Sequence, residues 1–193
     1  MTPLLVLLSA FAWLQTADPA QQAEARVAAD VTDAAKRSRP PAADQMPPNV
    51  QLIETVLSRR RLHQLEALGG LRLPRMDVFT TDGRHVMHSV GWDYRIPWRF
   101  NAALAERKGL PGGLSVDELA GFLTDGNGNP IPRPDAAGAD VVVFLYWAAW
   151  CGPCGTSLSE MRKLMAADAQ RRFVWITIEA DSVKQDVQRK TMR

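Results

Sequence analysis

Two cysteines, Cys151 and Cys154, are the residues of this chain whose type and spacing point most directly to chemistry. They are the only cysteines among 193 residues, and only Gly152 and Pro153 separate them. Two thiols this close can form and break a disulfide within one short loop, so the pair predicts thiol–disulfide exchange. Cys151 is the candidate catalytic nucleophile, and Cys154 is the candidate thiol that resolves the mixed disulfide.

Three other uses of the cysteine pair are weaker. A structural zinc site needs four ligands, and the three histidines (His63, His85 and His88) do not cluster with each other or with the cysteines in the sequence, so we predict no metal site. A purely structural disulfide would close a very small loop and restrict the unfolded chain little. Two inert buried thiols are disfavoured by Trp150 directly before the pair and by the Gly-Pro turn inside it.

The segments on either side of the pair predict how it is positioned. Residues 139–147 are apolar and rich in β-branched side chains, which predicts a strand buried on both faces. Residues 155–170 place apolar side chains at helical spacing. Cys151 therefore lies where a strand passes into a helix, close to the positive end of the helix and its unpaired N–H groups. Both features favour a thiolate over a thiol.

The stretch Trp-Ala-Ala-Trp-Cys-Gly-Pro-Cys, residues 147–154, resembles in this setting the active-site segment of the thioredoxin superfamily. The resemblance implies an α/β fold, a thioredoxin-like sheet with flanking helices, and a thiol–disulfide oxidoreductase that needs no cofactor. Trp150, Gly152 and Pro153 would then lie at the substrate-binding rim. The Gly-Pro pair resembles the reducing members of the superfamily, so we expect reduction rather than oxidation of the substrate.

The order of elements departs from the family pattern. Family members continue past the second parallel strand to a cis-proline opposite the dithiol, a hairpin and a closing helix, whereas no proline follows Pro153 here. Residues 70–108 resemble that proline–hairpin–helix unit, which gives the hypothesis of a permuted fold with Pro74 as the cis-proline near Cys151, at the substrate site. The alternatives are an ordinary hairpin followed by a helix, or an incomplete fold whose C-terminal half is missing.

A second departure concerns an acid. Thioredoxins often carry a buried carboxyl two residues before the first tryptophan of the stretch, and Leu145 occupies that position here. Glu179 and Asp181, at the end of the next predicted strand, are the candidate replacements for proton transfer, although acids there commonly cap a strand end. His85 and His88 fall in one predicted strand, where we expect them to share an exposed face, with metal binding as the weaker alternative.

The remaining elements follow from periodicity and turn signals. Residues 50–68 predict an amphipathic helix, and the Asp82-Gly83 pair predicts a hairpin turn. Ser115 and Glu118 form a capping-box pattern. The expected elements are strands at 76–81, 84–90 and 173–178, and helices at 96–108, 115–123 and 181–193.

The N-terminal region predicts export. Residues 1–17 contain an apolar stretch that suits a signal peptide or an N-terminal anchor, and residues 18–49 form an Ala- and Pro-rich linker expected to be disordered. The folded domain is then residues 50–193, with a hairpin–helix unit at 70–108 and a dithiol unit at 139–193. We expect a periplasmic or secreted protein, with a membrane tether if the apolar segment is retained.

Composition limits the partners. A net charge of +2 with scattered basic residues gives no nucleic-acid footprint. The expected partners are protein substrates with disulfides or thiols, and a membrane electron donor if the protein is an exported reductase. The alternative function is a weakly active or inactive thioredoxin-like binding protein, which would hold a partner chain at an exposed sheet edge.

Overall fold

A computed structural model gives the fold of residues 39–67, 70–112, 114–125, 127, 129–131 and 138–181. The predicted signal or anchor at 1–17, the first part of the linker and the helix expected beyond Asp181 lie outside these residues. Within them, no helix combines the length and apolarity that a membrane span requires.

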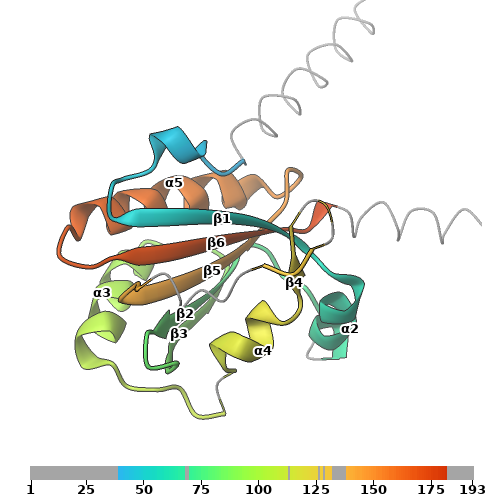
Figure 1. Cartoon of the computed structure of the whole chain (residues 1–193), viewed down its shortest axis with the longest axis horizontal. Helices are drawn as coiled ribbons and strands as arrows, with labels where there is room; N and C mark the ends of the chain where they lie inside the picture. Colours follow the sequence, from blue (N-terminus) through green and yellow to red (C-terminus); the bar gives the residue numbers. More distant parts are fainter. Residues whose placement is uncertain are drawn as a thin grey trace, which may run out of the picture.

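A mixed sheet forms the centre of the described structure, with six strands in the order β3-β2-β5-β6-β1-β4 (Figure 1). Strands β1, β6 and β5 run parallel to one another, while β2 and β3 form an antiparallel pair beside β5 and β4 runs antiparallel to β1. Every residue of β5 is buried, as expected for a central strand covered on both faces. The strands are β1 (Val50–Leu57), β2 (Arg75–Thr80), β3 (His85–Val90), β4 (Leu123–Thr124), β5 (Val141–Trp147) and β6 (Phe173–Glu179).

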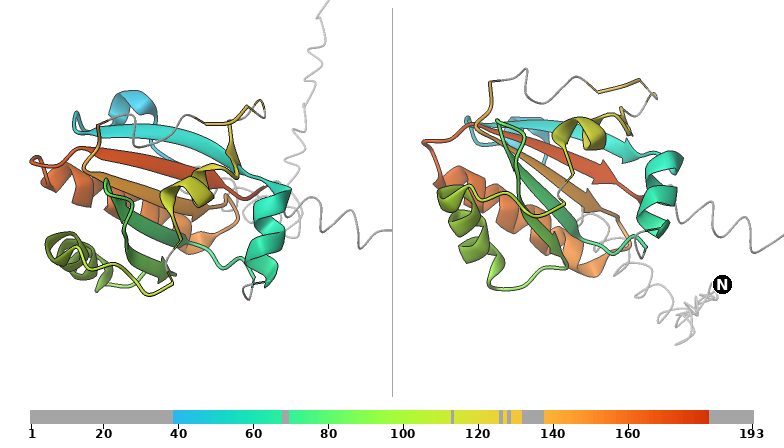
Figure 2. Two further views of the ribbon diagram at one scale, coloured as in Figure 1. Left: turned by 60° about the horizontal axis from the view of Figure 1, so that its bottom comes forward. Right: turned by 90° about the horizontal axis from the view of Figure 1, so that it is seen from below.

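Helices cover both faces of the sheet. Helices α3 and α5 lie on one side and α4 lies on the other (Figure 2). The ring of Phe100 in α3 stacks on that of Phe173 in β6, with 6.3 Å between ring centroids. The helices are α2 (Arg59–Ala67), α3 (Ile96–Glu106), α4 (Val116–Ala120) and α5 (Gly152–Ala167), and a 3₁₀ turn, η1, spans Ala43–Gln45. The expected α/β sheet with flanking helices is confirmed.

The prediction of one helix over residues 50–68 is wrong in its first half. Residues Val50–Leu57 form β1, which pairs with β6 from Val50 opposite Phe173 to Val56 opposite Glu179. The β-branched side chains of this segment suit a strand, and its apolar spacing fits a helix as well because the run is short. Pairing with β6 decides between the two, and the helix begins only at Arg59.

The segment before β1 is fixed to the end of α5. The side-chain amide of Asn49 donates hydrogen bonds to the carbonyl oxygens of Met165 and Asp168, at 3.0 and 2.9 Å. Asn49 belongs to the stretch predicted as linker, and these bonds attach its last residue to the helix that follows the cysteines.

The hairpin–helix unit lies next to the dithiol unit although it precedes it in the chain (Figure 1). Strand β2 pairs with β5, with Arg75 opposite Tyr146, so Pro74 lies at the end of the sheet where β5 runs into the cysteine loop. The Leu73–Pro74 peptide bond is cis. The place of Pro74 as the counterpart of the family's cis-proline stays a prediction.

Most of the other predicted elements are confirmed. The hairpin turns at Asp82-Gly83, and Gly83 has the positive φ of 80° that such turns need. Helix α3 and strand β6 lie where the sequence predicts them. The capping box is present, since Ser115 accepts from the Glu118 backbone while the Glu118 carboxylate accepts from the Ser115 backbone.

Candidate functional site

The cysteine pair lies at the junction of β5 and α5, as predicted. Cys151 and Cys154 form a disulfide with an S–S distance of 2.10 Å and a Cα–Cα distance of 5.4 Å. Cys151 is the N-cap of α5, and Pro153 lies in the first turn, where its missing N–H costs no helical hydrogen bond. Cys154 is completely buried, whereas Cys151 keeps 5% of its surface exposed. Cys151 is therefore the more exposed cysteine of the pair.

Hydrogen bonds from the neighbouring strand end hold the cysteine loop. The carboxylate of Asp181 accepts from the backbone N–H of Ala149 through both oxygens, at 2.9 and 3.1 Å. The N–H of Ala180 donates to the carbonyl of Trp147 at 2.9 Å. The sequence offers Asp181 as a candidate proton carrier, and the structure shows that it positions the loop that carries Cys151.

Exposed apolar side chains gather at the same end of the sheet. Trp150 is 49% exposed and Val90, the last residue of β3, is 46% exposed. The N–H of Gly91 donates to the carbonyl of Pro74 at 2.7 Å, which joins the end of β3 to the start of β2. The predicted rim residues Gly152 and Pro153 are exposed as well. The nearly buried Cys151 therefore has exposed apolar side chains at its end of the sheet.

Glu179, at the end of β6, has a carboxyl group whose pKa is raised. It pairs in register with Trp147, and burial raises the pKa of its carboxyl, with a further rise from the negative charge of Asp181. Leu145, at the position of the family's usual acid, is buried and apolar. Glu179 thus remains the candidate proton carrier of this site.

We expect Glu179→Gln to alter how stability depends on pH. The folded protein binds the Glu179 proton more tightly than the unfolded chain, so wild-type stability falls as the pH rises from the ordinary glutamate range through the raised pKa. Glutamine removes this loss, and urea unfolding from pH 4 to 8 should show a flatter profile for the variant. Glu160→Gln, at an exposed ion pair with Lys163 in α5, is the matched control and should keep the wild-type profile. Parallel profiles for wild type and Glu179→Gln would contradict the prediction.

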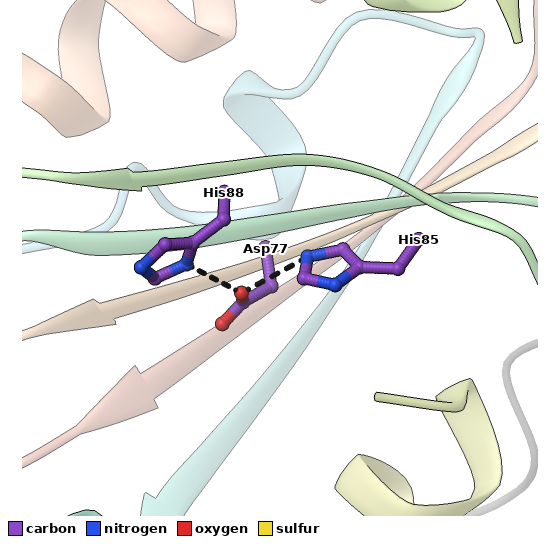
Figure 3. A group of neighbouring side chains, drawn as sticks. All are labelled: Asp77, His85 and His88. Atoms are coloured by element: carbon purple, nitrogen blue, oxygen red, sulfur yellow. Dashed lines mark hydrogen bonds and ion pairs between the residues drawn. The ribbon is translucent and has the colours of Figure 1, made fainter. Parts of the chain in front are cut away.

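A second group of polar side chains lies on the β2–β3 hairpin, where the sequence predicted only an exposed strand face. Asp77 is fully buried, and its Oδ1 atom lies 2.8 Å from His88 Nδ1 and 3.1 Å from His85 Nε2 (Figure 3). Only 8% of His85 is exposed, so the prediction of an exposed face is wrong for this residue.

A β-bulge explains why the two histidines share a face. Residues three apart in a regular strand point to opposite faces. In β3, however, Met87 pairs with Val78 while His85 pairs with Phe79, so Val86 is an extra residue. The bulge returns His85 to the face that carries His88. No pattern in the sequence marks this bulge, which is why the group could not be predicted.

Asp77 is ionised in this group. Burial alone would raise the pKa of its carboxyl, but contacts with His85 and His88 and the positive charge of Arg75 outweigh burial and hold the pKa well below its usual range. Arg75 Nε lies 3.2 Å from Asp77 Oδ2, whereas both histidines contact Oδ1. The two carboxylate oxygens therefore have separate partners.

Comparison with known proteins gives one match. The model of the AhpC/TSA family matches residues 118–193, a segment that contains β5, the cysteine pair, α5 and β6. No curated protein and no solved structure matches the chain. The family is thioredoxin-like and indicates thiol-dependent oxidoreductase chemistry. The match covers the dithiol unit of the chain, and the mixed sheet with its flanking helices agrees with a thioredoxin-like fold.

Proposed function

We propose that this protein is a thiol–disulfide oxidoreductase that reduces disulfides in exported proteins through Cys151 and Cys154. The observation that carries the proposal is the disulfide at the start of α5, in which Cys151 is the less deeply buried cysteine and Cys154 is fully buried. The helix N-terminus stabilises a thiolate on Cys151, which is the form that attacks disulfides. The exposed side chains of Trp150 and Val90 supply apolar area for a substrate chain.

The reaction has two exchange steps. The Cys151 thiolate attacks one sulfur of the substrate disulfide, a mixed disulfide forms, and the second substrate sulfur leaves as a thiolate. The Cys154 thiolate then attacks Cys151 Sγ, which releases the first substrate sulfur and closes the Cys151–Cys154 disulfide. The substrate gains two electrons and the protein loses two. A reductant must open the disulfide again before the next cycle.

Export and the electron supply are part of the proposal. The apolar stretch at residues 1–17 followed by an Ala- and Pro-rich segment suits a chain that is secreted to the periplasm or tethered to its membrane. A reductase outside the cytoplasm needs electrons from across the membrane, so the proposed partner is a membrane-bound dithiol donor. The reduction potential of the cysteine pair tests whether the protein reduces or oxidises its substrate. A value of about −270 mV would match the reducing members, and a value of about −120 mV would indicate a strong oxidant.

The Cys154→Ser variant should trap the first exchange step. With no resolving thiol, reduced Cys154→Ser is expected to accumulate a mixed disulfide between Cys151 and a substrate such as insulin. Non-reducing electrophoresis and mass spectrometry would detect the complex and locate its sulfur. The Cys151→Ser/Cys154→Ser double variant is the matched control and should trap nothing. A complex formed equally by the double variant, or none formed by Cys154→Ser, would rule out the proposed exchange.

A further inference from the structure

The Asp77, His85 and His88 side chains, here called the hairpin triad, offer metal-ligand atoms to one point. Asp77 Oδ1, His85 Nε2 and His88 Nδ1 all lie within 4.8 Å of one another (Figure 3). Two imidazole nitrogens and one carboxylate oxygen form a ligand set that zinc and similar divalent transition metals take up, with a fourth position left for water. No cysteine belongs to the triad, so it is separate from the disulfide.

His85 supplies a second, independent observation. Its ring is more than nine-tenths buried, yet neither ring nitrogen makes a hydrogen bond of acceptable geometry within the described chain. The Nε2 atom lies 3.1 Å from Asp77 Oδ1 but is not aligned with it as a hydrogen-bond donor or acceptor. A buried nitrogen without a hydrogen-bond partner destabilises the fold. A metal ion between the three side chains would take the lone pair of this nitrogen and remove this destabilisation.

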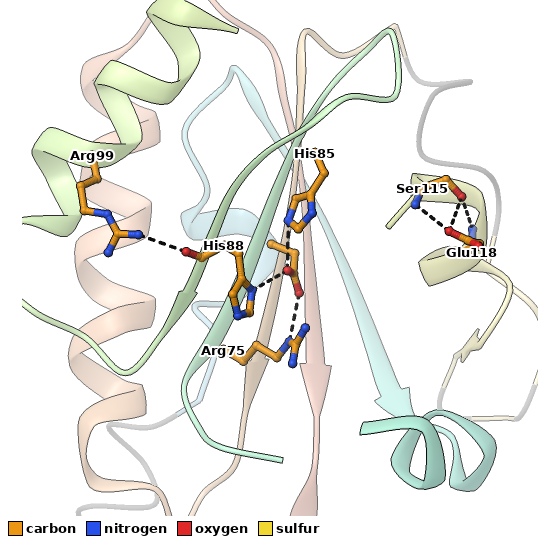
Figure 4. A network of polar contacts seen from close by, with 7 residues as sticks. Arg75, His85, His88, Arg99, Ser115 and Glu118 are labelled. Atoms are coloured by element: carbon orange, nitrogen blue, oxygen red, sulfur yellow. Dashed lines mark hydrogen bonds and ion pairs between the residues drawn. The ribbon is translucent and has the colours of Figure 1, made fainter. Parts of the chain in front are cut away.

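The surroundings hold the three ligands in place. The ring of Phe79 stacks on His85 at 4.6 Å between centroids, and Arg75 contacts Asp77 Oδ2, whereas both histidines contact Oδ1. Arg99 Nη2 donates to the backbone carbonyl of His88 at 3.1 Å (Figure 4). In known metal sites, side chains that contact the metal-ligating residues hold them in the right orientation. His88, with 36% of its side chain exposed, leaves a route for an ion from solvent.

We propose that the hairpin triad binds one divalent transition-metal ion of the zinc type, through Asp77 Oδ1, His85 Nε2 and His88 Nδ1. The ion would fasten β2 to β3 across the bulge, on a ligand set distinct from the cysteines. The proposal does not depend on disulfide exchange.

The test uses the full chain in its oxidised, disulfide-bonded form, stripped with a chelator and then titrated with Co²⁺ and Zn²⁺. Because both thiols are in the disulfide, Co²⁺ bound at the triad should give visible ligand-field bands without thiolate charge-transfer bands. Zn²⁺ should displace it at one equivalent per chain and raise the melting temperature. The NMR ring signals of two histidines should shift, while that of His63 should not.

Two substitutions test whether the metal ion binds at the hairpin triad. His88→Gln changes the most exposed ligand and should weaken Zn²⁺ binding by at least about tenfold. His63→Gln, on the exposed face of α2, is the matched control and should bind like wild type. The proposal is overturned if the wild-type chain binds neither ion at one equivalent, or if His88→Gln binds Zn²⁺ as tightly as wild type. The wild-type Co²⁺ titration and histidine shifts decide the question by themselves if His88→Gln does not fold.

Discussion

Replacing Cys151 with serine is expected to lower insulin reduction in the presence of dithiothreitol to the rate of dithiothreitol alone. Serine has nearly the shape of cysteine, so the buried site should stay packed, but its hydroxyl neither attacks a disulfide at neutral pH nor forms one. The loss should therefore be in the exchange reaction and not in folding. Insulin turbidity at equal protein concentrations measures the rate, and a thermal melt of the variant checks that it is folded.

The same assay separates the two functions considered for this protein. Cys154→Ser is the matched control because it keeps the attacking thiol. Once it has been reduced and freed of dithiothreitol, it should consume one equivalent of insulin disulfide and then stop. Equal rates for wild type and Cys151→Ser would exclude catalysis by the pair. That result would favour the alternative of a thioredoxin-like protein that binds a partner chain without exchanging disulfides.

Among single substitutions of polar residues in the β2–β3 hairpin, Asp77→Asn is expected to lower the free energy of unfolding the most. The carboxylate is fully buried beside Arg75, His85 and His88, and removing its charge leaves these groups without their anion. Breaking a buried ion pair in this way costs about 3–5 kcal/mol. Urea unfolding at pH 7 in the presence of a chelator would measure the loss without any contribution from metal binding.

The effect of Asp77→Asn should also depend on pH. The folded-state pKa of Asp77 is lower than that of an unfolded aspartate, so its contribution is complete above about pH 4 and is lost as the pH falls towards the folded-state pKa. The difference between wild type and variant should accordingly shrink in acid. Asp82→Asn, at an exposed carboxylate in the turn of the same hairpin, is the control and should be close to neutral. A comparable loss for both variants at pH 7 would show that burial of Asp77 is not the cause.

The parts of this molecule that the sequence predicted well depend on neighbours in the chain. The buried strand β5, the helix after Cys154 and the turn at Gly83 each follow from a short run of residues whose chemistry allows one local structure. The cysteine site lies within such a run, so its position could be inferred from the amino-acid sequence alone. Pro74 could be placed only through the resemblance to a family, because it lies far from Cys151 in the sequence.

The parts that the sequence missed depend on pairing between distant segments. The run from Val50 to Leu57 fits a helix or a strand, and only hydrogen bonding to β6 decides for the strand. The triad depends on one extra residue, Val86, whose presence in β3 reverses which face His85 occupies. A shift of one residue reverses every side chain that follows it, so strand alternation in the sequence cannot reveal such a site.

The parallel pair of β1 and β6 also affects how long this protein takes to become folded after synthesis begins. Thr55 of β1 hydrogen-bonds to Thr177 of β6, a residue 122 positions later. At roughly 5–20 residues per second, a ribosome needs roughly 6–25 s to make the intervening chain. During that time β1 has no partner strand, and the pairing that then forms closes a long loop, which is slow. The sheet therefore cannot be completed until β6 has been synthesised.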